Sequence, residues 1–372
     1  MNELSTIDCV HFGPCSGCTL SGKVDFPPIW NEVQKYFLSH HIEADLIRGA
    51  VCQWRTKAKL AVRKNGDRVQ IGLFQTGSHT VVPIPNCQVH HPSINLVIHV
   101  LTDLLQKENF PIYDEKSHLG LLRYIQCFVE LKTQKVQLVL VVKEDQSILR
   151  SLCEKLQKSP LFHSIWINIQ PSVSNRIFGD QWIHLIGKKF LKQELLGHPF
   201  YFHPAAFSQV HWALFERLVA DVEKWIEADA KLAEIYAGIG MMGTVYASKC
   251  KKVDLIESNP FAEMSFQRGP SYPNIKYFLQ DASNRSLLDA DHILIDPPRK
   301  GVDKNLLNKI KKFHGKLIYI SCNFQTFVRD VSELMDAGFI LKEARCYLFF
   351  PGTDHVEVTA LLTSASGLSP CK

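Results

Sequence analysis

Side chains that could support methyl transfer to a carbon atom follow apolar runs in the second half of the chain. Cys322 and Asp296 each come directly after such a run, and His355 and Glu357 lie close to the last one. A thiolate adds to an electron-poor double bond, such as C5=C6 of uracil, and C5 can then attack an activated methyl group. A general base must finally remove the C5 proton, and His355 or Glu357 is placed for that step.

A glycine-rich turn upstream predicts the site of the methyl donor. Gly238, Gly240 and Gly243 follow an apolar run and open a helix-like stretch, and Glu257 ends the next run. Glycines at this spacing let a backbone approach a nucleotide at the edge of a sheet, and the acid can accept hydrogen bonds from ribose hydroxyls. These features alone fit a nicotinamide cofactor and S-adenosylmethionine equally well.

The segment around Asp296 separates these two cofactors. Pro297 and Pro298 restrict the backbone after Asp296, so its carboxylate can orient the cofactor and the target base. A dehydrogenase has no evident use for this segment or for Cys322. The sequence therefore favours S-adenosylmethionine, although a structural turn remains the alternative for the Asp-Pro-Pro segment taken alone.

The elements that position these residues alternate between strands and helices. We expect an α/β fold of Rossmann-like, doubly wound type over residues 200–372, preceded over residues 1–199 by an α+β region. The cysteines and basic residues of this first region, described below, make it a candidate RNA-binding region that carries a cysteine metal site. The last two strands, 344–350 and 356–362, should pair antiparallel at an edge of the sheet. The expected parallel strands are 232–236, 253–257, 275–279, 292–295 and 317–320.

Composition limits the class of protein. Of the 372 residues, 46% are hydrophobic and 21% charged, which is ordinary for a folded domain pair, and a net charge of +5 permits RNA without demanding it. The first residues lack a secretory signal, and no segment is apolar enough to span a membrane. We expect a cytoplasmic protein with no membrane association and no obligate protein partner.

The clustered cysteines predict a metal site. Cys9, Cys15 and Cys18 fall within ten residues, and Cys87 can supply a fourth thiolate from a distant loop. Four thiolates suit an iron–sulfur cluster or a structural zinc ion, and spacing alone does not decide between them.

Taken together, these motifs resemble those of the bacterial RNA uracil-C5-methyltransferases, which methylate uridines in ribosomal or transfer RNA with S-adenosylmethionine. The resemblance covers nearly the whole chain. It includes a Ser-Cys-Asn element around Cys322 and a closing signature of Phe350, Pro351, Thr353, His355 and Glu357.

The resemblance implies roles for individual residues. Cys322 falls on the family's nucleophile and Glu357 on its proton-abstracting glutamate, while Phe207 is a candidate stacking partner for the target base. Positions that contact S-adenosylmethionine in the family correspond to Gln209, Tyr236, Gly238, Gly240, Glu257, Asp281 and Asp296.

The cysteine spacing is similar to that of the ribosomal RNA branch of the family. This implies a [4Fe–4S] cluster on Cys9, Cys15, Cys18 and Cys87, with structural zinc as the alternative, and 23S ribosomal RNA as the partner. Methylation of transfer RNA is the alternative activity. An RNA-binding protein with a degenerate site is a further alternative, because four positions depart from the family motifs: His211, Met241, Leu348, and Phe324, which replaces the proline of the family's Ser-Cys-Asn-Pro element.

A basic stretch in the first half is a candidate for RNA contact. Its cations alternate with apolar residues, so several would line one face of a strand. A solvated strand face explains the same alternation. The cations are Arg55, Lys57, Lys59, Arg63, Lys64 and Arg68, and Arg123 could also reach RNA or brace the domains.

Overall fold

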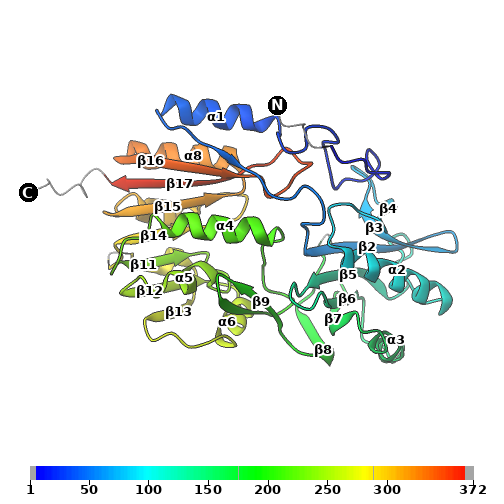
Figure 1. The fold of residues 1–372 in the computed structure, drawn as a ribbon. Helices are drawn as coiled ribbons and strands as arrows, with labels where there is room; N and C mark the ends of the chain where they lie inside the picture. Colours follow the sequence, from blue (N-terminus) through cyan, green and yellow to red (C-terminus); the bar gives the residue numbers. More distant parts are fainter. Residues whose placement is uncertain (1–5, 175, 288, 365–372) are drawn as a thin grey trace, which may run out of the picture. The chain divides into compact units, whose positions relative to one another are not determined.

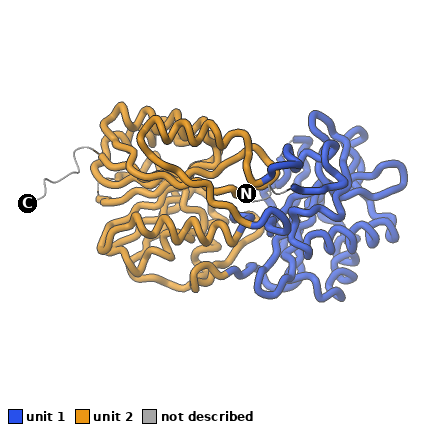
Figure 2. The backbone as a smooth tube through the Cα atoms, turned by 45° about the horizontal axis from the view of Figure 1, so that its top comes forward, with its two compact units in different colours: residues 1–24, 50–193, 208–211 blue, residues 25–49, 194–207, 212–372 orange. Residues whose placement is uncertain are grey.

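The computed structural model describes residues 6–174, 176–287 and 289–364. The chain divides into two compact units (Figure 2). Unit 1 comprises residues 1–24, 50–193 and 208–211, and unit 2 comprises residues 25–49, 194–207 and 212–372. The expected boundary between residues 199 and 200 falls within the segment 194–207, which packs with unit 2, as does the early segment 25–49.

Unit 2 is built on an eight-stranded sheet with the order β1-β16-β17-β15-β14-β11-β12-β13 (Figure 1). All neighbouring strands are parallel except at β17, which runs antiparallel to both β15 and β16. The Rossmann-like α/β fold is thus confirmed. The strands are β1 (Leu46–Ile47), β11 (Lys231–Ile235), β12 (Lys252–Glu257), β13 (Ile275–Leu279), β14 (His292–Ile295), β15 (Lys316–Ser321), β16 (Phe339–Tyr347) and β17 (Glu357–Ser364).

The antiparallel pair does not form the edge of the sheet as expected. β17 lies between β15 and β16, and β1 pairs in parallel with β16 to become the edge strand. β1 has only two residues, which is too short to show a strand period in the sequence.

Helices cover both faces of this sheet, so its central strands are buried and read as continuous apolar runs. Side chains of α1, α7 and α8 share one hydrophobic cluster with the sheet. On another part of unit 2, the Tyr246 hydroxyl of α5 donates to the Val219 carbonyl oxygen of α4 at 2.9 Å. The helices are α1 (Ile29–Ser39), α4 (Trp212–Glu223), α5 (Met241–Tyr246), α6 (Pro260–Gln267), the 3-10 helix η1 (Ala282–Asn284), α7 (Lys304–Ile310) and α8 (Phe324–Asp336).

Unit 1 contains a seven-stranded sheet with the order β4-β3-β2-β5-β6-β7-β8. Neighbouring strands are antiparallel except for β6 and β7, which are connected through α3. The helices α2 (Pro92–Lys107) and α3 (Ile148–Gln157) pack on one face of the sheet. The strands are β2 (Lys57–Asn65), β3 (Arg68–Phe74), β4 (Val81–Pro83), β5 (Leu122–Val129), β6 (Val136–Val142), β7 (Phe162–Ile169) and β8 (Gln181–Gly187).

The opposite face of this sheet carries a smaller cluster rich in aromatic residues, including Tyr124 and Trp166. Two further strands, β9 (Leu191–Leu195) and β10 (His198–Phe202), form a separate two-stranded sheet. Among the described helices, none is both long and apolar enough to cross a membrane.

Candidate active site

Cys322 lies in the turn between β15 and α8 and is partly exposed. Asn323 is the N-cap of α8, and its side-chain oxygen accepts a hydrogen bond from the Gln325 backbone N–H at 3.1 Å. The Ser321 hydroxyl donates to the Asn323 carbonyl oxygen at 3.0 Å. These local bonds fix the backbone on both sides of the thiol.

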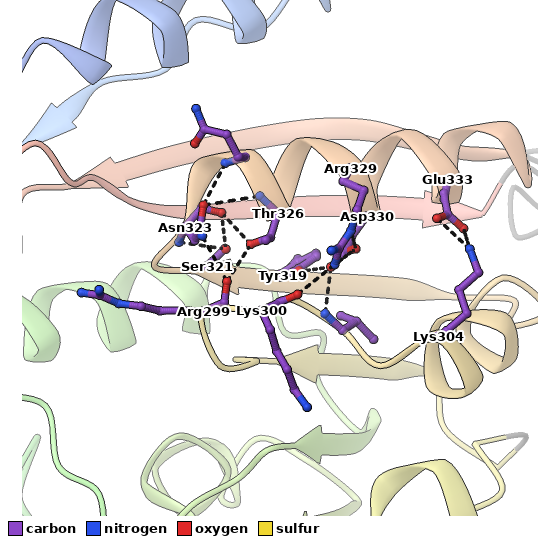
Figure 3. Close-up of polar contacts among 12 residues, drawn as sticks. Arg299, Lys300, Lys304, Tyr319, Ser321, Asn323, Thr326, Arg329, Asp330 and Glu333 are labelled. Carbon is purple, nitrogen blue, oxygen red and sulfur yellow. Dashed lines mark hydrogen bonds and ion pairs between the residues drawn. The ribbon is translucent and has the colours of Figure 1, made fainter. Parts of the chain in front are cut away.

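The turn after β15 is tied to the loop that follows β14 and carries Asp296 (Figure 3). The Asn323 side-chain amide donates to the Arg299 carbonyl oxygen at 3.1 Å, and the Thr326 hydroxyl approaches the same oxygen at 3.4 Å. Arg329 of α8 donates to the Lys300 carbonyl oxygen at 3.0 Å. The loops bearing Cys322 and Asp296 therefore have fixed positions relative to each other.

A buried acid of α8 completes this connection. The Asp330 carboxylate accepts hydrogen bonds from the Val302 N–H at 2.8 Å and from the Tyr319 hydroxyl of β15 at 2.7 Å. Arg329 forms an ion pair with it at 2.6 Å. Sequence reasoning missed Asn323 and Asp330 as positioning residues, although an Asn directly before an amphipathic helix is a recognisable N-cap signal.

Glu357 begins β17 and is buried, with 6% of its surface exposed. Its strand neighbours β15, whose end carries Cys322, and β15 in turn neighbours β14, whose end precedes Asp296. The three expected functional groups thus come from three adjacent strands of one sheet. His355, the other candidate base, is exposed.

Burial and mutual repulsion set the protonation of these groups. Burial, followed by repulsion from Glu357 and Asp296, raises the pKa of the Cys322 thiol to about 11, while Arg299 opposes this rise. Burial also raises the pKa of Asp296 to about 7 and that of Glu357 well above its usual range. In the protein alone the surroundings therefore raise the thiol pKa, because burial and two nearby acids disfavour the thiolate.

The glycine turn between β11 and α5 has the backbone that its sequence predicts. Gly238 and Gly240 have φ values of 55° and 73°, which an L side chain rarely adopts. A Cβ on Gly240 would also lie 2.4 Å from Leu255 Cδ1. The Gly243 N–H donates to the buried Glu234 carboxylate at 2.6 Å, so an acid of β11 anchors the start of α5.

Glu257 ends β12 and braces the glycine turn from the neighbouring strand. Its carboxylate accepts hydrogen bonds from the backbone N–H groups of Gly238 at 3.0 Å, Ser258 at 2.8 Å and Asn259 at 2.8 Å. The sequence predicted that this acid meets ribose hydroxyls. The structure shows that the same carboxylate holds the glycine turn in place.

Tyr236 and Asp281 also lie near the carboxyl ends of parallel strands. Tyr236 follows β11 and has a φ of 60°, an uncommon value for a residue other than glycine that recurs at functional sites. Asp281 follows β13 and caps η1, accepting from the Ser283 N–H at 2.7 Å. Seven of the expected catalytic and cofactor residues therefore lie along one end of the unit 2 sheet. Each is in, or next to, a turn that follows a parallel strand. They are Tyr236, Gly238, Gly240, Glu257, Asp281, Asp296 and Cys322.

Gln209 belongs to the segment 208–211 of unit 1, so its role toward the cofactor stays a prediction. Phe207 belongs to unit 2 and is 66% exposed, so it is not a core residue. His211, one of the departures from the family motif, is buried in unit 1, where its ring stacks on Trp54 with centroids 5.4 Å apart.

The other departures have local structural roles. Phe324 begins α8 where the family has proline, and its buried ring packs against Tyr36 and Phe327 at centroid distances of 5.6 and 6.4 Å. Met241 and Leu348 are buried as well. The turn after Cys322 is therefore held by the Asn323 cap and by packing instead of by a proline ring.

The four expected metal ligands line one cavity of unit 1, with a volume of about 120 Å³. We call this cavity, bounded by Cys9, Cys15, Cys18 and Cys87, the cysteine pocket. Burial, followed by repulsion from the other three thiols, raises the pKa of Cys18 to about 11. In residues 6–174, 176–287 and 289–364, no group of three or more His, Cys, Asp or Glu side chains is arranged to hold a metal ion.

The basic stretch is only partly exposed: Lys59, Lys64 and Arg68 are exposed, and its role toward RNA stays a prediction. Lys57 and Arg63 are buried, and burial lowers the pKa of Lys57 to about 7. Arg55 lines the cysteine pocket, and Lys59 is exposed on the face of the sheet opposite α2.

The chain is similar in sequence to known RNA methyltransferases. The family model described as tRNA (Uracil-5-)-methyltransferase matches residues 279–365. An uncharacterized RNA methyltransferase of Protochlamydia amoebophila is 34% identical over 95% of this chain and 97% of its own length. An uncharacterized RNA methyltransferase of Listeria innocua is 32% identical over 83% of this chain and 71% of its own length.

A solved structure shares the fold. The tRNA (uracil-54, C5)-methyltransferase of Pyrococcus abyssi, in complex with S-adenosyl-L-homocysteine, superposes with a TM-score of 0.79 at 24% identity, over 94% of this chain and 86% of that one. The matched family model includes Cys322 and Glu357. The chain therefore belongs to the S-adenosylmethionine-dependent RNA (uracil-5-)-methyltransferases.

Proposed function

We propose that this protein methylates C5 of a uridine in 23S ribosomal RNA and that Cys322 forms a transient covalent bond to the base. One observation carries the proposal: Cys322, Asp296 and Glu357 come from adjacent strands and are close enough for the two acids to raise the pKa of the thiol. A nucleophile, an orienting acid and a base are the groups that this chemistry needs.

The methyl donor binds at the carboxyl ends of β11 to β14, as ligands do in open sheets of this class. The turn at Gly238 and Gly240 approaches the nucleoside part, and the Glu257 carboxylate, already fixed by three N–H groups, accepts from the ribose. Tyr236 and Asp281 flank the same edge, and Asp296 orients the methyl end toward the base.

Cys322 begins the reaction when its thiolate bonds to C6 of the uracil, which places the electron pair of the double bond on C5. C5 then bonds to the methyl carbon of S-adenosylmethionine while the carbon–sulfonium bond breaks and S-adenosylhomocysteine leaves. Glu357 next takes the proton from C5, the C5=C6 bond forms again and the Cys322 thiolate departs. The product is 5-methyluridine, and one proton remains on Glu357.

Glu357 is better suited than His355 to accept the C5 proton. Burial raises its pKa well above the usual range, which makes its carboxylate a stronger base than an exposed glutamate. His355 has an exposed side chain that is only partly desolvated. This partial desolvation, followed by the positive charge of the nearby Arg299, lowers its pKa and weakens it as a base.

The target uridine must leave its helix before a thiol can reach C6. Phe207 is 66% exposed in unit 2 and supplies an aromatic surface on which an extruded base can stack. An exposed phenylalanine on a protein that binds RNA fits this role better than a packing role.

Two substitutions test the chemistry. Cys322→Ala should abolish turnover and leave S-adenosylmethionine affinity unchanged, as measured by calorimetry. Glu357→Gln should accumulate a protein–RNA adduct on denaturing gels, because addition and methylation proceed but elimination stops, whereas His355→Gln should turn over without an adduct. Full turnover by Cys322→Ala would contradict the role of Cys322 as the nucleophile. An adduct that accumulates with His355→Gln but not with Glu357→Gln would contradict the role of Glu357 as the base.

We further propose that the cysteine pocket binds a [4Fe–4S] cluster, with structural zinc as the alternative. The pocket supplies four thiols, and their mutual repulsion at Cys18 would be relieved by cationic iron. The metal would connect residues 9–18 to the loop of Cys87 and so stabilise unit 1. The methylation steps need no electron, so the cluster takes no part in them.

Metal analysis of anaerobically purified protein tests this proposal. Iron and sulfide with visible absorbance support the cluster, zinc alone supports the alternative, and the absence of both in folded protein contradicts it. Cys18→Ser should lose the metal and lower Tm, whereas Cys52→Ser, a partly exposed cysteine outside the pocket, should change neither.

The RNA species requires a test in cells. The cysteine pocket favours ribosomal RNA through the resemblance to that branch of the family, and methylation of transfer RNA is the alternative. Mapping 5-methyluridine in 23S ribosomal and transfer RNA, from cells with and without the gene, should show one ribosomal position that depends on the gene. Loss of the modification from transfer RNA alone would refute the ribosomal assignment.

A further inference from the structure

We propose that a second pocket, in unit 1, binds an unpaired nucleotide of the substrate RNA other than the target uridine. The inference rests on the proposed function, because it assumes an RNA substrate. The pocket has a volume of about 670 Å³ and lies on the sheet face opposite α2 and α3. We call it the sheet-face pocket, and its lining includes Lys59, Phe74, Glu115, Arg123, Tyr124 and Val173.

Two buried arginines hold this pocket together: Arg123 lines it, and Arg63 is bonded to the backbone of Arg123. Arg123 donates to the carbonyl oxygens of Gln170 and Ser172, both at 2.7 Å, and so holds the loop that follows β7. Arg63 donates to the Arg123 carbonyl oxygen at 2.7 Å and forms an ion pair with Glu115 in the loop before β5. The pocket is therefore organised before any ligand arrives.

Aromatic rings surround these arginines. The Arg63 guanidinium lies 5.3 Å from the ring centroid of Phe74 and 5.1 Å from that of Tyr124, and Arg123 lies 4.5 Å from the ring of Tyr113. Arg63 and Arg123 are only 8% and 3% exposed, yet the Nε atom of each lacks a hydrogen-bond partner within the described part of the chain. The bonds that hold the loops are made by terminal guanidinium nitrogens of the two arginines, and they leave both Nε–H donors without a partner among the described residues.

The charge of the pocket suits a phosphate group. Arg123 contacts carbonyl oxygens, and no carboxylate among the described residues pairs with Lys59. The one acid, Glu115, is already paired with Arg63 and with His79, whose Nδ1 lies 2.6 Å from it. Two cations thus remain without an anionic partner, and a nucleotide phosphate supplies one.

The chemistry of the walls suits a base. Proteins read single-stranded RNA by stacking splayed bases on aromatic rings and on arginine guanidinium groups, and by bonding their polar edges. Phe74 and Tyr124 offer the rings, and Glu115 offers an acceptor. The volume falls within the roughly 300–1,000 Å³ typical of sites for small ligands.

Substitutions at the exposed rim test the pocket without disturbing the core. Val173 lines the pocket and is 68% exposed, so Val173→Glu adds a negative charge at low cost in stability. Val173→Lys is the matched opposite change. Leu96→Glu, at a position of α2 that is 51% exposed on the other side of the sheet, is the control for a new surface acid.

The probe is a fluorescein-labelled single-stranded octaribonucleotide, tested as oligo(U), oligo(A) and oligo(C), with binding measured by anisotropy at fixed salt. Val173→Glu should weaken binding roughly 5- to 150-fold, the range for the loss of one stacked base. Val173→Lys and Leu96→Glu should bind within about twofold of the unsubstituted protein. Phe74→Leu, which keeps an apolar side chain but removes the ring, should also weaken binding.

Equal affinity of all three charge variants would overturn the proposal. The proposal would also be overturned if inorganic phosphate alone displaced the oligonucleotide and Phe74→Leu had no effect on binding. The pocket would then bind anions in general and not a nucleotide. The same proteins are then treated with RNA that contains 5-fluorouridine. If Val173→Glu weakens oligonucleotide binding but no adduct forms, the proposed covalent mechanism is contradicted and the nucleotide-binding role of the pocket is supported. If an adduct forms but Val173→Glu does not weaken binding, only the role of the pocket is contradicted.

Discussion

The protonation state of Cys322 gives a quantitative prediction about the protein without RNA. Burial, with repulsion from Glu357 and Asp296, raises the thiol pKa from its ordinary 9.0 to about 11. At pH 8 about one molecule in a thousand then carries the thiolate, compared with about one in ten for an unperturbed cysteine, a ratio of about 100. We therefore expect alkylation of Cys322 by iodoacetamide to be slow in the folded protein.

Two opposing effects set the expected rate. A more basic thiolate is also more nucleophilic, with a Brønsted coefficient of about 0.4–0.5, so two pKa units return about tenfold. The folded protein should react about tenfold more slowly at pH 8 than the same cysteine in urea-unfolded protein. The pH profile is the clearer signature, because the rate should keep rising through pH 10 when folded and level off near pH 9 when unfolded.

Arg299 provides an internal check on the cause. Its positive charge opposes the rise in the Cys322 pKa, so Arg299→Gln should slow alkylation further, whereas Arg299→Lys, which keeps the charge, should have a smaller effect. Peptide mass spectrometry resolves Cys322 from the other ten cysteines. A rate for folded Cys322 that levels off below pH 9, or faster alkylation in Arg299→Gln, would refute this electrostatic reasoning.

Other changes test the elements that hold the site. Asn323→Ala removes an N-cap and a tie between two active-site loops, and should lower the free energy of unfolding by about 1–3 kcal/mol in urea titrations and slow adduct formation. Gly240→Ala should weaken S-adenosylmethionine binding at least about tenfold, as measured by calorimetry. The φ of Gly240 is positive, and an added Cβ would lie 2.4 Å from a neighbouring side chain. Gly22→Ala is the control, because a Cβ on Gly22 meets no atom of the described residues within 4 Å. Burial alone would raise the pKa of the Asp221 carboxyl group. Hydrogen bonds and charges of neighbouring cations have the larger effect and lower this pKa from the ordinary 3.8 to about 2. The wild-type protein should therefore exceed Asp221→Asn in stability by about 1–2 kcal/mol above pH 4, and this difference should shrink as the pH falls toward 2.

The gathering of the candidate site residues at one end of the unit 2 sheet could be predicted because its signals are local. Asp296 and Cys322 each follow an apolar run, and the carboxyl ends of parallel strands meet at one edge of a sheet. The structure brings these residues together with Glu357 through the order of β14, β15 and β17. The glycine turn was equally readable, because Gly240 needs a backbone that other residues avoid.

Features that depend on distant contacts could not be predicted. The two-residue strand β1 is defined only by its pairing with β16. The pKa of Cys322 depends on burial and on the charges near the sulfur, and the sequence does not show that Glu357 and Asp296 both act on it. The alternating cations of β2 read as a solvated or RNA-binding face, whereas Lys57 and Arg63 are buried and only Lys59 faces a pocket.

The most direct test of the central claim uses RNA that contains 5-fluorouridine, prepared from cells that lack the gene and were grown with 5-fluorouracil. Fluorine at C5 replaces the proton that Glu357 must remove, so the reaction should stop after methyl transfer. With S-adenosylmethionine present, we expect a stable protein–RNA adduct in which mass spectrometry finds a methylated 5-fluorouracil bonded to Cys322. Protein that methylates ordinary RNA from the same cells but forms no such adduct at Cys322 would contradict the account.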